Sequence, residues 1–403
     1  MDNATFQKII LEMPVWDCHT HLVGSQLNLK NIWDLAHYFW FHQELRAAGY
    51  PIDPSDFDPS SANLDVAMQQ FLDAYRLTRN TAMNWCVTRI LKDLYDVELT
   101  DLESVRRADQ KIRQLAEDPA FSKVTLEKTN LKQIAVGSLR DADFKGLPNI
   151  SFYIPRLDGL IRDNIKEIEH AASPTHALQE FAQKFDALFT DYEKKSVTAV
   201  TLAIPKPEEP CGTFEGFSTP YPSHAEVSNA VLHTICRLCE AHHFCLQLFM
   251  GMETGWTLDP SGRTAENDPT RIHKLYGLFE NHPSCQFEIV CAAELNNLDI
   301  VHAAEMFPNV SAGGLWWYSY KPSVFRDAMQ KRLESLPRSK CSLITSDSRQ
   351  IQWCYGKIML VKKILADFLW EQIQQDWLSE EDALDLANWW LYQAAAVRYQ
   401  AKL

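Results

Sequence analysis

The sequence has 403 residues, 46% of them hydrophobic and 23% charged, which is the composition of a soluble globular protein. The formal net charge of -14 argues against a general binder of nucleic acid or anionic membranes, because no field draws phosphates inward. We expect neither a secretory signal nor a membrane-spanning segment, which requires about 18 apolar residues, and the ten scattered cysteines fit a reducing cytoplasm.

The first predicted strand, VWDCHTHL over residues 15–22, carries potential metal ligands on alternate residues. Side chains two positions apart in a strand share a face, so Asp17, His19 and His21 are expected to project in one direction. Two neighbouring imidazoles suit a single divalent metal ion, although both could be ordinary strand-end histidines. Asp17 lies deeper and is expected either to orient a ligand or to be a buried structural carboxylate.

Residues 25–130 are predicted to be almost wholly helical. One amphipathic helix is expected over residues 31–49, where Gly49 and then Pro51 give a stop signal, and a second long run over 62–95. A third helix begins at Thr100 or Asp101 as its N-cap. We expect this block to be an insertion after the first strand that contributes to the active site.

From residue 131 onward, short apolar runs alternate with helical stretches, which predicts a parallel sheet. The runs are LKQIAVG, NISFYIPRLD, VTAVTLAIP, FCLQLFMG, QFEIVCAA, NVSAGGLWWY and KCSLITSD. With residues 15–22 these make eight strands, the number that closes a (β/α)8 TIM-type barrel. Residues 1–24 and 131–403 would form this barrel, with extra C-terminal helices at 350–370 and 379–400. The alternative is an open doubly wound sheet, but no glycine-rich phosphate loop supports it.

The carboxyl ends of barrel strands form the active site, and there the first and last strands are neighbours. His19 and His21 would therefore converge with Asp347, at the end of the eighth strand, and leave positions open for water or substrate. The alternative is that Asp347 caps the helix that begins near Gln350. We expect one divalent ion, with zinc preferred and iron or manganese also suited to these ligands.

Other polar and aromatic side chains are expected at the same end of the barrel. Arg156 and Asp158 follow the third strand, Trp316 and Trp317 the seventh, and Arg349 the eighth. Arg156 and Asp158 could instead form a structural ion pair. The two tryptophans are expected to face opposite ways as neighbours in a strand, one toward the pocket, unless both are plain core residues.

These motifs, in this order and over nearly the whole chain, resemble the uronate isomerases of the amidohydrolase superfamily. The matching segments are DCHTH, AHYFWFHQELRAAG, PRLDGLI, SAGGLWWYS and TSDSRQIQWCYGK. The resemblance implies interconversion of an aldohexuronate and its ketose, D-glucuronate with D-fructuronate or D-galacturonate with D-tagaturonate. It also singles out the His-Tyr pair, His37 and Tyr38, which plain helix packing could equally explain.

This chemistry moves hydrogen between C2 and C1 through an enediol, so it needs a base and an acid. Asp347 is the expected base, and Tyr38 and His37 are the candidates to move protons at the oxygens or at C1. Arg156 and Arg349 are the expected partners of the substrate carboxylate, since a guanidinium can bind it through two hydrogen bonds. The partner is thus a small anionic sugar acid; homo-oligomers are left open.

The sequence departs from the family after the fifth strand. Phe249 and Thr254 stand where the family has a histidine and an arginine, and Glu253 could supply a polar group instead. Lys206 lies in a proline-rich loop and is not expected to bridge two metals, which favours a single ion. The competing functions are a metal-dependent hydrolase or non-redox lyase on the same scaffold, and a binding protein without turnover.

Overall fold

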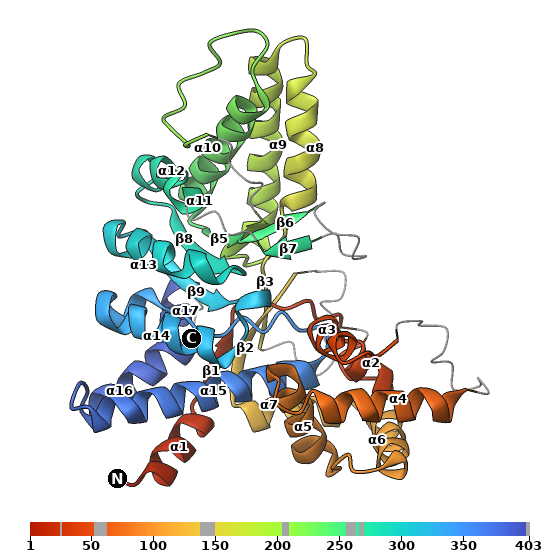
Figure 1. The fold of residues 1–403 in the computed structure, drawn as a ribbon. Coiled ribbons are helices and arrows are strands. Elements are labelled where there is room, and N and C mark those ends of the chain that lie inside the picture. The colour runs from red at the N-terminus through yellow and green to blue at the C-terminus, as the bar shows by residue number, and fades with distance from the viewer. Residues whose placement is uncertain are drawn as a thin grey trace. The chain divides into compact units, whose positions relative to one another are not determined.

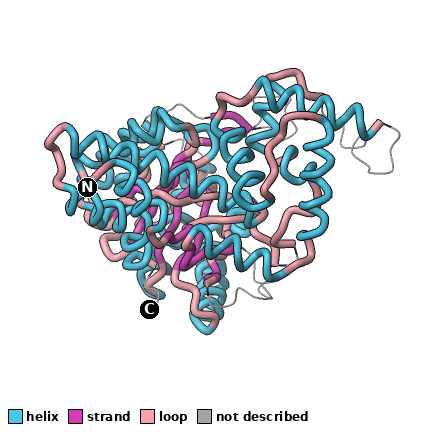
Figure 2. Tube along the Cα trace, turned by 90° about the horizontal axis from the view of Figure 1, so that it is seen from below, coloured by secondary structure: helices cyan, strands magenta, loops and turns pink. Residues whose placement is uncertain are grey.

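The structure is a computed structural model, and it describes residues 1–24, 26–51, 63–137, 150–203, 209–254, 263–265 and 270–399. Helices and short parallel strands make a mixed α/β fold (Figure 1). Figure 2 shows how strongly helices predominate along the described chain. The chain divides into two compact units, which we describe separately. Unit 1 comprises Met1–Ile134, Leu139–Ser151 and Ser346–Leu384, and unit 2 comprises Ala135–Ser138, Phe152–Thr345 and Asp385–Leu403.

Unit 1 is built around one long buried helix, α15 (Ile351–Gln374), which packs against three others. Apolar residues surround most of α15, as expected of a helix buried on nearly all sides. β1 (Val15–Asp17) pairs in parallel with β2 (Leu131–Val136) as far as Ile134. The last two residues of β2 belong to unit 2, as do Phe152 and Tyr153 of β3 (Ser151–Tyr153). The other helices are α1 (Asn3–Glu12), α2 (Ile32–Ala36), α3 (Phe39–Ala47), α4 (Leu64–Leu77), α5 (Ala82–Tyr95), α6 (Leu102–Leu115) and α7 (Pro119–Thr129).

The helical block is confirmed as helical, but two of its expected helices are each broken in two. The helix expected over 31–49 is interrupted at His37 and Tyr38, between α2 and α3. The run expected over 62–95 is interrupted between α4 and α5, because Glu44 of α3 accepts hydrogen bonds from the first turn of α5. Tertiary contacts therefore set these breaks. Asp101 is the N-cap of α6, as the sequence indicates.

Unit 2 contains a four-stranded parallel sheet in the order β4-β5-β8-β9. The strands are β4 (Ala199–Ala203), β5 (Cys245–Met250), β8 (Gln286–Cys291) and β9 (Val310–Leu315). β6 (Met252–Thr254) and β7 (Arg263–Ala265) pair antiparallel as a separate two-stranded sheet. The helices are α8 (Asp158–Glu169), α9 (Pro174–Lys194), α10 (His224–His242), α11 (Thr270–His273), α12 (Tyr276–Asn281), α13 (Asn297–Met306), α14 (Pro322–Ser335) and α17 (Ala394–Arg398). α16 (Glu380–Asn388) spans the boundary between the units and leads into a π-helical turn, Trp389–Gln393.

The described strands form three separate sheets, so the expected closed barrel of eight regular strands is not confirmed. The third strand ends at Tyr153, two residues before Pro155, which has no N–H to donate. Beyond it, Ile154 donates to the Val136 carbonyl and Arg156 forms an isolated bridge to Thr201. The eighth predicted strand, residues 340–347, makes one isolated bridge from Cys341 to β9. What the structure shows is a mixed α/β fold with parallel sheets.

Two further expectations concern the rest of the chain. All ten cysteines are buried and free, and Cys236 and Cys239 lie within α10, which agrees with a reduced CxxC on a packed helix. Among the described helices, none combines the length and the apolar character that a bilayer crossing demands. The division of the barrel from an insertion at residues 25–130 stays a prediction.

Candidate metal centre

His19 and His21 lie just beyond the carboxyl end of β1, which stops at Asp17, and they still point the same way. Their ring centroids are 5.0 Å apart and the ring planes are nearly perpendicular, at 88°. The alternation of a strand persists past β1 because residues 19–21 remain hydrogen-bonded to the segment that carries Asp347. Asp347 donates its N–H to the His19 carbonyl at 2.9 Å, and His21 donates to the Ser348 carbonyl at 2.8 Å.

Asp347 lies at a local irregularity in this pairing. Between these two hydrogen bonds the first segment has one residue, Thr20, whereas the second segment has two, Asp347 and Ser348. One extra residue on one of two paired segments is the arrangement of a β-bulge. The extra residue is accommodated by a left-handed backbone at Asp347, where φ is 52°. Aspartate is among the few residues that tolerate this region, and a bulge re-aims the side chain.

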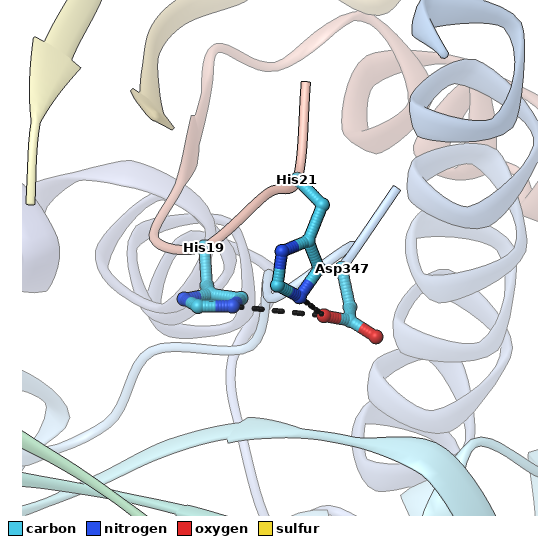
Figure 3. Close-up of side chains that lie close together, drawn as sticks. All are labelled: His19, His21 and Asp347. Atoms are coloured by element: carbon cyan, nitrogen blue, oxygen red, sulfur yellow. Dashed lines mark ion pairs between the residues drawn. The ribbon is translucent and has the colours of Figure 1, made fainter. Parts of the chain in front are cut away.

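The three predicted ligand side chains meet, as Figure 3 shows. Oδ1 of Asp347 lies 2.9 Å from Nε2 of His21 and 3.6 Å from Nε2 of His19. Ligands about 2.1 Å from a tetrahedral zinc ion would be separated by about 3.4 Å, so these distances suit a common ion. The alternative role of Asp347 as a helix cap is wrong, since Gln350 occupies the N-cap of α15.

The charges and burial of the group fit a metal site. Burial raises the pKa of Asp347, but the contacts with His21 and His19 and the charge of Lys357 outweigh it and hold that pKa well below the ordinary carboxyl value. The carboxylate is therefore ionised. Its buried Oδ1 has no hydrogen bond of good geometry from the described residues, although two imidazole nitrogens lie beside it. No other group of three potential ligands is found in the described ranges.

Asp17 supports the backbone at this centre. Its Oδ1 accepts the N–H of His19 at 3.3 Å and the N–H of Ser346 at 3.0 Å, so it links the two segments that carry the ligands. Burial raises the pKa of Asp17 to about 6. Of the two expectations for Asp17, these contacts favour the buried structural carboxylate.

Tyr38 is brought to the centre by the break between α2 and α3. Its hydroxyl donates to the Asp347 carbonyl at 3.2 Å, and its ring stacks on Trp353 at a centroid distance of 4.1 Å. Burial, together with the charge of Asp347, raises the pKa of Tyr38 well above that of an ordinary phenol. The hydroxyl therefore keeps its proton, as a hydrogen-bond donor requires.

Lys357, one turn after Trp353 on α15, is a residue whose role the sequence analysis missed. It is fully buried and donates from Nζ to the Tyr38 hydroxyl at 2.9 Å and to the Ser346 carbonyl. Its ammonium also lies 3.2 Å from the centroid of the Trp40 ring. Burial lowers the pKa of Lys357 to about 7. The available signal was a lysine within an otherwise apolar helix segment, a residue type that is rarely buried without a partner.

His37 lies in an aromatic cluster, whereas Tyr38 lies at the metal centre. The His37 ring stacks on Trp33 at 6.0 Å and meets His42 at 5.5 Å, and Tyr50 completes the cluster. Burial, and then the charge of His42, lower the pKa of His37 to about 4. These contacts suit the helix-packing alternative and keep the imidazole neutral at pH 7.

Arg156 and Asp158 belong to unit 2, where they form the ion pair that was the alternative expectation. Nε of Arg156 lies 3.0 Å from Asp158 Oδ2, and Asp158 Oδ1 accepts the N–H of Ala203 at 2.6 Å. Asp158 is thereby fixed between the end of the third strand and β4. The pair leaves the exposed Arg156 side chain anchored through Nε, the inner nitrogen of its guanidinium.

Trp316 and Trp317 also belong to unit 2, and the expectation that they face opposite ways in a strand is wrong. β9 ends at Leu315, and Trp317 has a left-handed backbone with φ of 50°, so strand alternation no longer applies. The two indole rings contact each other with centroids 5.5 Å apart. Phe249, at the position where the sequence resemblance predicts a histidine, packs edge-on against Trp316 with ring centroids 4.9 Å apart.

The remaining candidate residues are Arg349, Lys206, Glu253 and Thr254. Arg349 is exposed in unit 1, two residues after Asp347, and its charge lowers the pKa of Tyr38 slightly against the larger effect of burial. Lys206 and the side chains of Glu253 and Thr254 lie outside what the structure describes.

Comparison with known proteins identifies the fold of this chain. A scan of protein-family models gives no match, and a search of the curated proteins gives none. Several solved structures are similar over nearly the entire chain, and three of them are named as uronate or glucuronate isomerases. They are a uronate isomerase from Thermotoga maritima (TM-score 0.80, 13% identity, 98% of this chain and 97% of that chain), a uronate isomerase from Bacillus halodurans (0.71, 17%, 99% and 96%) and a glucuronate isomerase from Caulobacter crescentus (0.81, 13%, 100% and 94%). The chain therefore has the fold of the uronate isomerases.

Proposed function

We propose that this protein is a hexuronate isomerase, an intramolecular oxidoreductase that interconverts D-glucuronate and D-fructuronate or D-galacturonate and D-tagaturonate. One observation carries the proposal: His19, His21 and Asp347 converge in a chain with the fold of the uronate isomerases. Three solved structures with this fold are named for that activity, which supports the reaction. The closed (β/α)8 barrel, with residues 25–130 as its insertion, belongs to the same proposal.

His19, His21 and Asp347 would hold the divalent ion, with zinc first among the ions that suit them. A bound ion supplies Lewis-acid polarisation of substrate oxygens. Asp347, whose pKa is held well below the ordinary carboxyl value by His21, His19 and Lys357, is proposed as the base that takes the proton from C2 and returns it at C1. Tyr38 and His37 are proposed to transfer protons at the substrate oxygens. Positioned acid–base groups typically raise the reaction rate by a factor of about 10² to 10⁴.

The substrate carboxylate needs cationic partners, and Arg156 and Arg349 are proposed for this role. Asp158 holds Nε of Arg156, an arrangement that would orient the two terminal guanidinium nitrogens toward a carboxylate. Trp316 and Trp317 are proposed as apolar walls for the sugar ring. We expect the working location to be the cytoplasm, because its reducing conditions suit ten free cysteines.

The test is proton NMR of D-glucuronate and of D-galacturonate with the purified protein in heavy water. We expect ketose to form with deuterium at the exchanging carbon and about one divalent ion per chain, lost on chelation or when His19 and His21 are both replaced by alanine. Asp347→Asn should reduce kcat by at least about 10². Asp376→Asn is the matched control, because Asp376 has the same left-handed backbone, with φ of 59°, but is exposed.

Two outcomes would contradict the proposal. Full isomerase activity in Asp347→Asn would remove Asp347 as the base. Turnover of an amide, ester or lactone with no change in any uronate would instead assign the metal-dependent hydrolase of the same scaffold.

A further inference from the structure

The backbone around Asp347 is held by side chains from three separate segments of unit 1. Asp17 accepts the N–H of Ser346, Lys357 donates to the Ser346 carbonyl, and Tyr38 donates to the Asp347 carbonyl. Main-chain bonds to residues 19–21 complete the set. Aspartate tolerates a left-handed backbone but does not favour it over the ordinary regions, so these bonds help to hold Asp347 in that conformation.

Lys357 is the centre of this frame. It bonds the Ser346 carbonyl directly and reaches the next carbonyl, that of Asp347, through the Tyr38 hydroxyl. The two hydrogen bonds run in one direction. Lys357 Nζ donates to the Tyr38 hydroxyl oxygen, and that hydroxyl donates to the Asp347 carbonyl. Two consecutive carbonyls of the bulge are thus oriented by one buried ammonium.

Helix α15 presents this arrangement on a single face. Trp353 and Lys357 are four residues apart and therefore lie one above the other, so the first stacks on the Tyr38 ring while the second bonds its hydroxyl. The Lys357 ammonium also lies 3.2 Å from the centroid of the Trp40 ring, a cation–π geometry that stabilises a cation out of water. Burying a lysine costs free energy unless its ammonium is well paired. These contacts therefore indicate that the Lys357 ammonium is held in one defined position.

We propose that Lys357 is a positioning residue that, directly through Ser346 and indirectly through Tyr38, fixes the left-handed backbone from which Asp347 is aimed at His19 and His21. The inference rests on the metal-dependent function proposed above and deepens it. It assigns to Tyr38 a contact with the ligand-bearing backbone in addition to any role in proton transfer. Residues behind the ligands commonly affect metal affinity by about 10-fold to 100-fold.

The same helix offers a matched control. Lys362 is also buried on α15 and donates to three carbonyls, those of Leu11, Met13 and Thr129, at 2.7 to 2.9 Å. Replacing Lys362 by methionine removes a buried ammonium with comparable bonds without touching Tyr38 or Ser346. It therefore reports the general cost of losing such a lysine.

The experiment measures the zinc dissociation constant by chelator competition, and the visible spectrum of the cobalt-substituted protein, for Lys357→Met, Tyr38→Phe, the double variant and Lys362→Met. We expect each single variant to weaken binding about 10-fold to 100-fold and to change the cobalt spectrum. The double variant should lose less than the two single losses combined, because part of the effect of Lys357 is transmitted through Tyr38. Lys362→Met should keep the affinity and spectrum of the wild type.

Wild-type affinity and spectrum in Lys357→Met would overturn the inference, as would equal losses in Lys357→Met and Lys362→Met. If Lys357→Met fails to fold, Tyr38→Phe decides, since a purely proton-transferring Tyr38 would leave metal affinity unchanged. A wild-type protein that binds neither ion would also overturn it. These measurements need no substrate, so a protein with the expected metal behaviour but no isomerase activity would contradict only the proposed function.

Discussion

His37 and Tyr38 are adjacent in the sequence, but the break between α2 and α3 gives them different environments. Tyr38 turns to the Asp347 carbonyl, while His37 packs with Trp33 and His42. The sequence motif pairs them as one functional unit. The contacts instead give Tyr38 the stronger link to the metal centre and give His37 a role in packing the α2 and α3 region.

The environment of His37 predicts a pH dependence of stability. Its pKa is lowered from 6.5 to about 4 in the folded chain, so the unfolded chain binds more protons between these values. The contribution of neutral His37 to the free energy of unfolding should therefore be complete above pH 6.5. The free energy of unfolding should then decline as the pH falls toward 4. In His37→Gln this decline should become shallower, by at most about 1.4 kcal/mol per pH unit, in urea unfolding followed across that window. An identical slope in the variant would contradict the assignment.

At the scale of elements, close packing determines which helical positions must be glycine. α12 contains Gly277, where an added Cβ would lie 1.7 Å from the carbonyl oxygen of Cys211. The Cys211 N–H also donates to the Lys274 carbonyl at 2.6 Å, so this loop is fixed against the helix. Gly159 in α8, by contrast, has nothing within 4 Å of such a Cβ.

The surroundings of Gly159 and Gly277 predict that replacing each by alanine changes the free energy of unfolding in opposite directions. Alanine normally favours a helix over glycine by up to about 1 kcal/mol, so Gly159→Ala should be neutral or stabilising. Gly277→Ala should reduce the free energy of unfolding by about 1–3 kcal/mol, because the helix and the loop must separate. Urea denaturation of both variants measures the effect. A stabilising Gly277→Ala would show that the close approach to Cys211 is absent in solution.

At the scale of the whole molecule, buried charges connect distant parts of the chain within one unit. Glu288 of β8 is fully buried, and its carboxylate accepts hydrogen bonds from Gln247, Ser342, Tyr399 and, at 2.5 Å, Arg398. Arg398 ends α17, 110 residues further along the chain. The C-terminal helix thus supplies the cation that compensates a carboxylate in the core of unit 2.

Removing that cation should be costly. Arg398→Met would leave the Glu288 carboxylate without its cationic partner, and we expect a loss of about 3–5 kcal/mol in the free energy of unfolding. Arg338→Met is the matched control, because the ion pair of Arg338 with Asp385 is exposed and such pairs contribute about 0–1 kcal/mol. Equal, small losses in the two variants would contradict a compensating role for Arg398.

The sequence alone predicted the features that depend on local patterns and on motif order. The alternation of His19 and His21, the carboxylate of Asp347 after the last predicted strand, and the strand and helix periodicity from residue 131 all lie in short segments. The resemblance to the uronate isomerases then indicated the fold, which the solved structures confirm. These inferences succeeded because side-chain direction along a strand and amphipathic spacing along a helix are short-range properties.

Only the tertiary structure revealed the left-handed bulge at Asp347, the break at Tyr38 and the role of Lys357. Lys357 lies 319 residues from Tyr38, and no periodicity connects them. Their association follows because carbonyls buried in a bulge must find donors, and the donors come from whichever segments the core brings near. The sequence therefore determines which groups can bind a metal, while packing decides how the backbone beneath them is held.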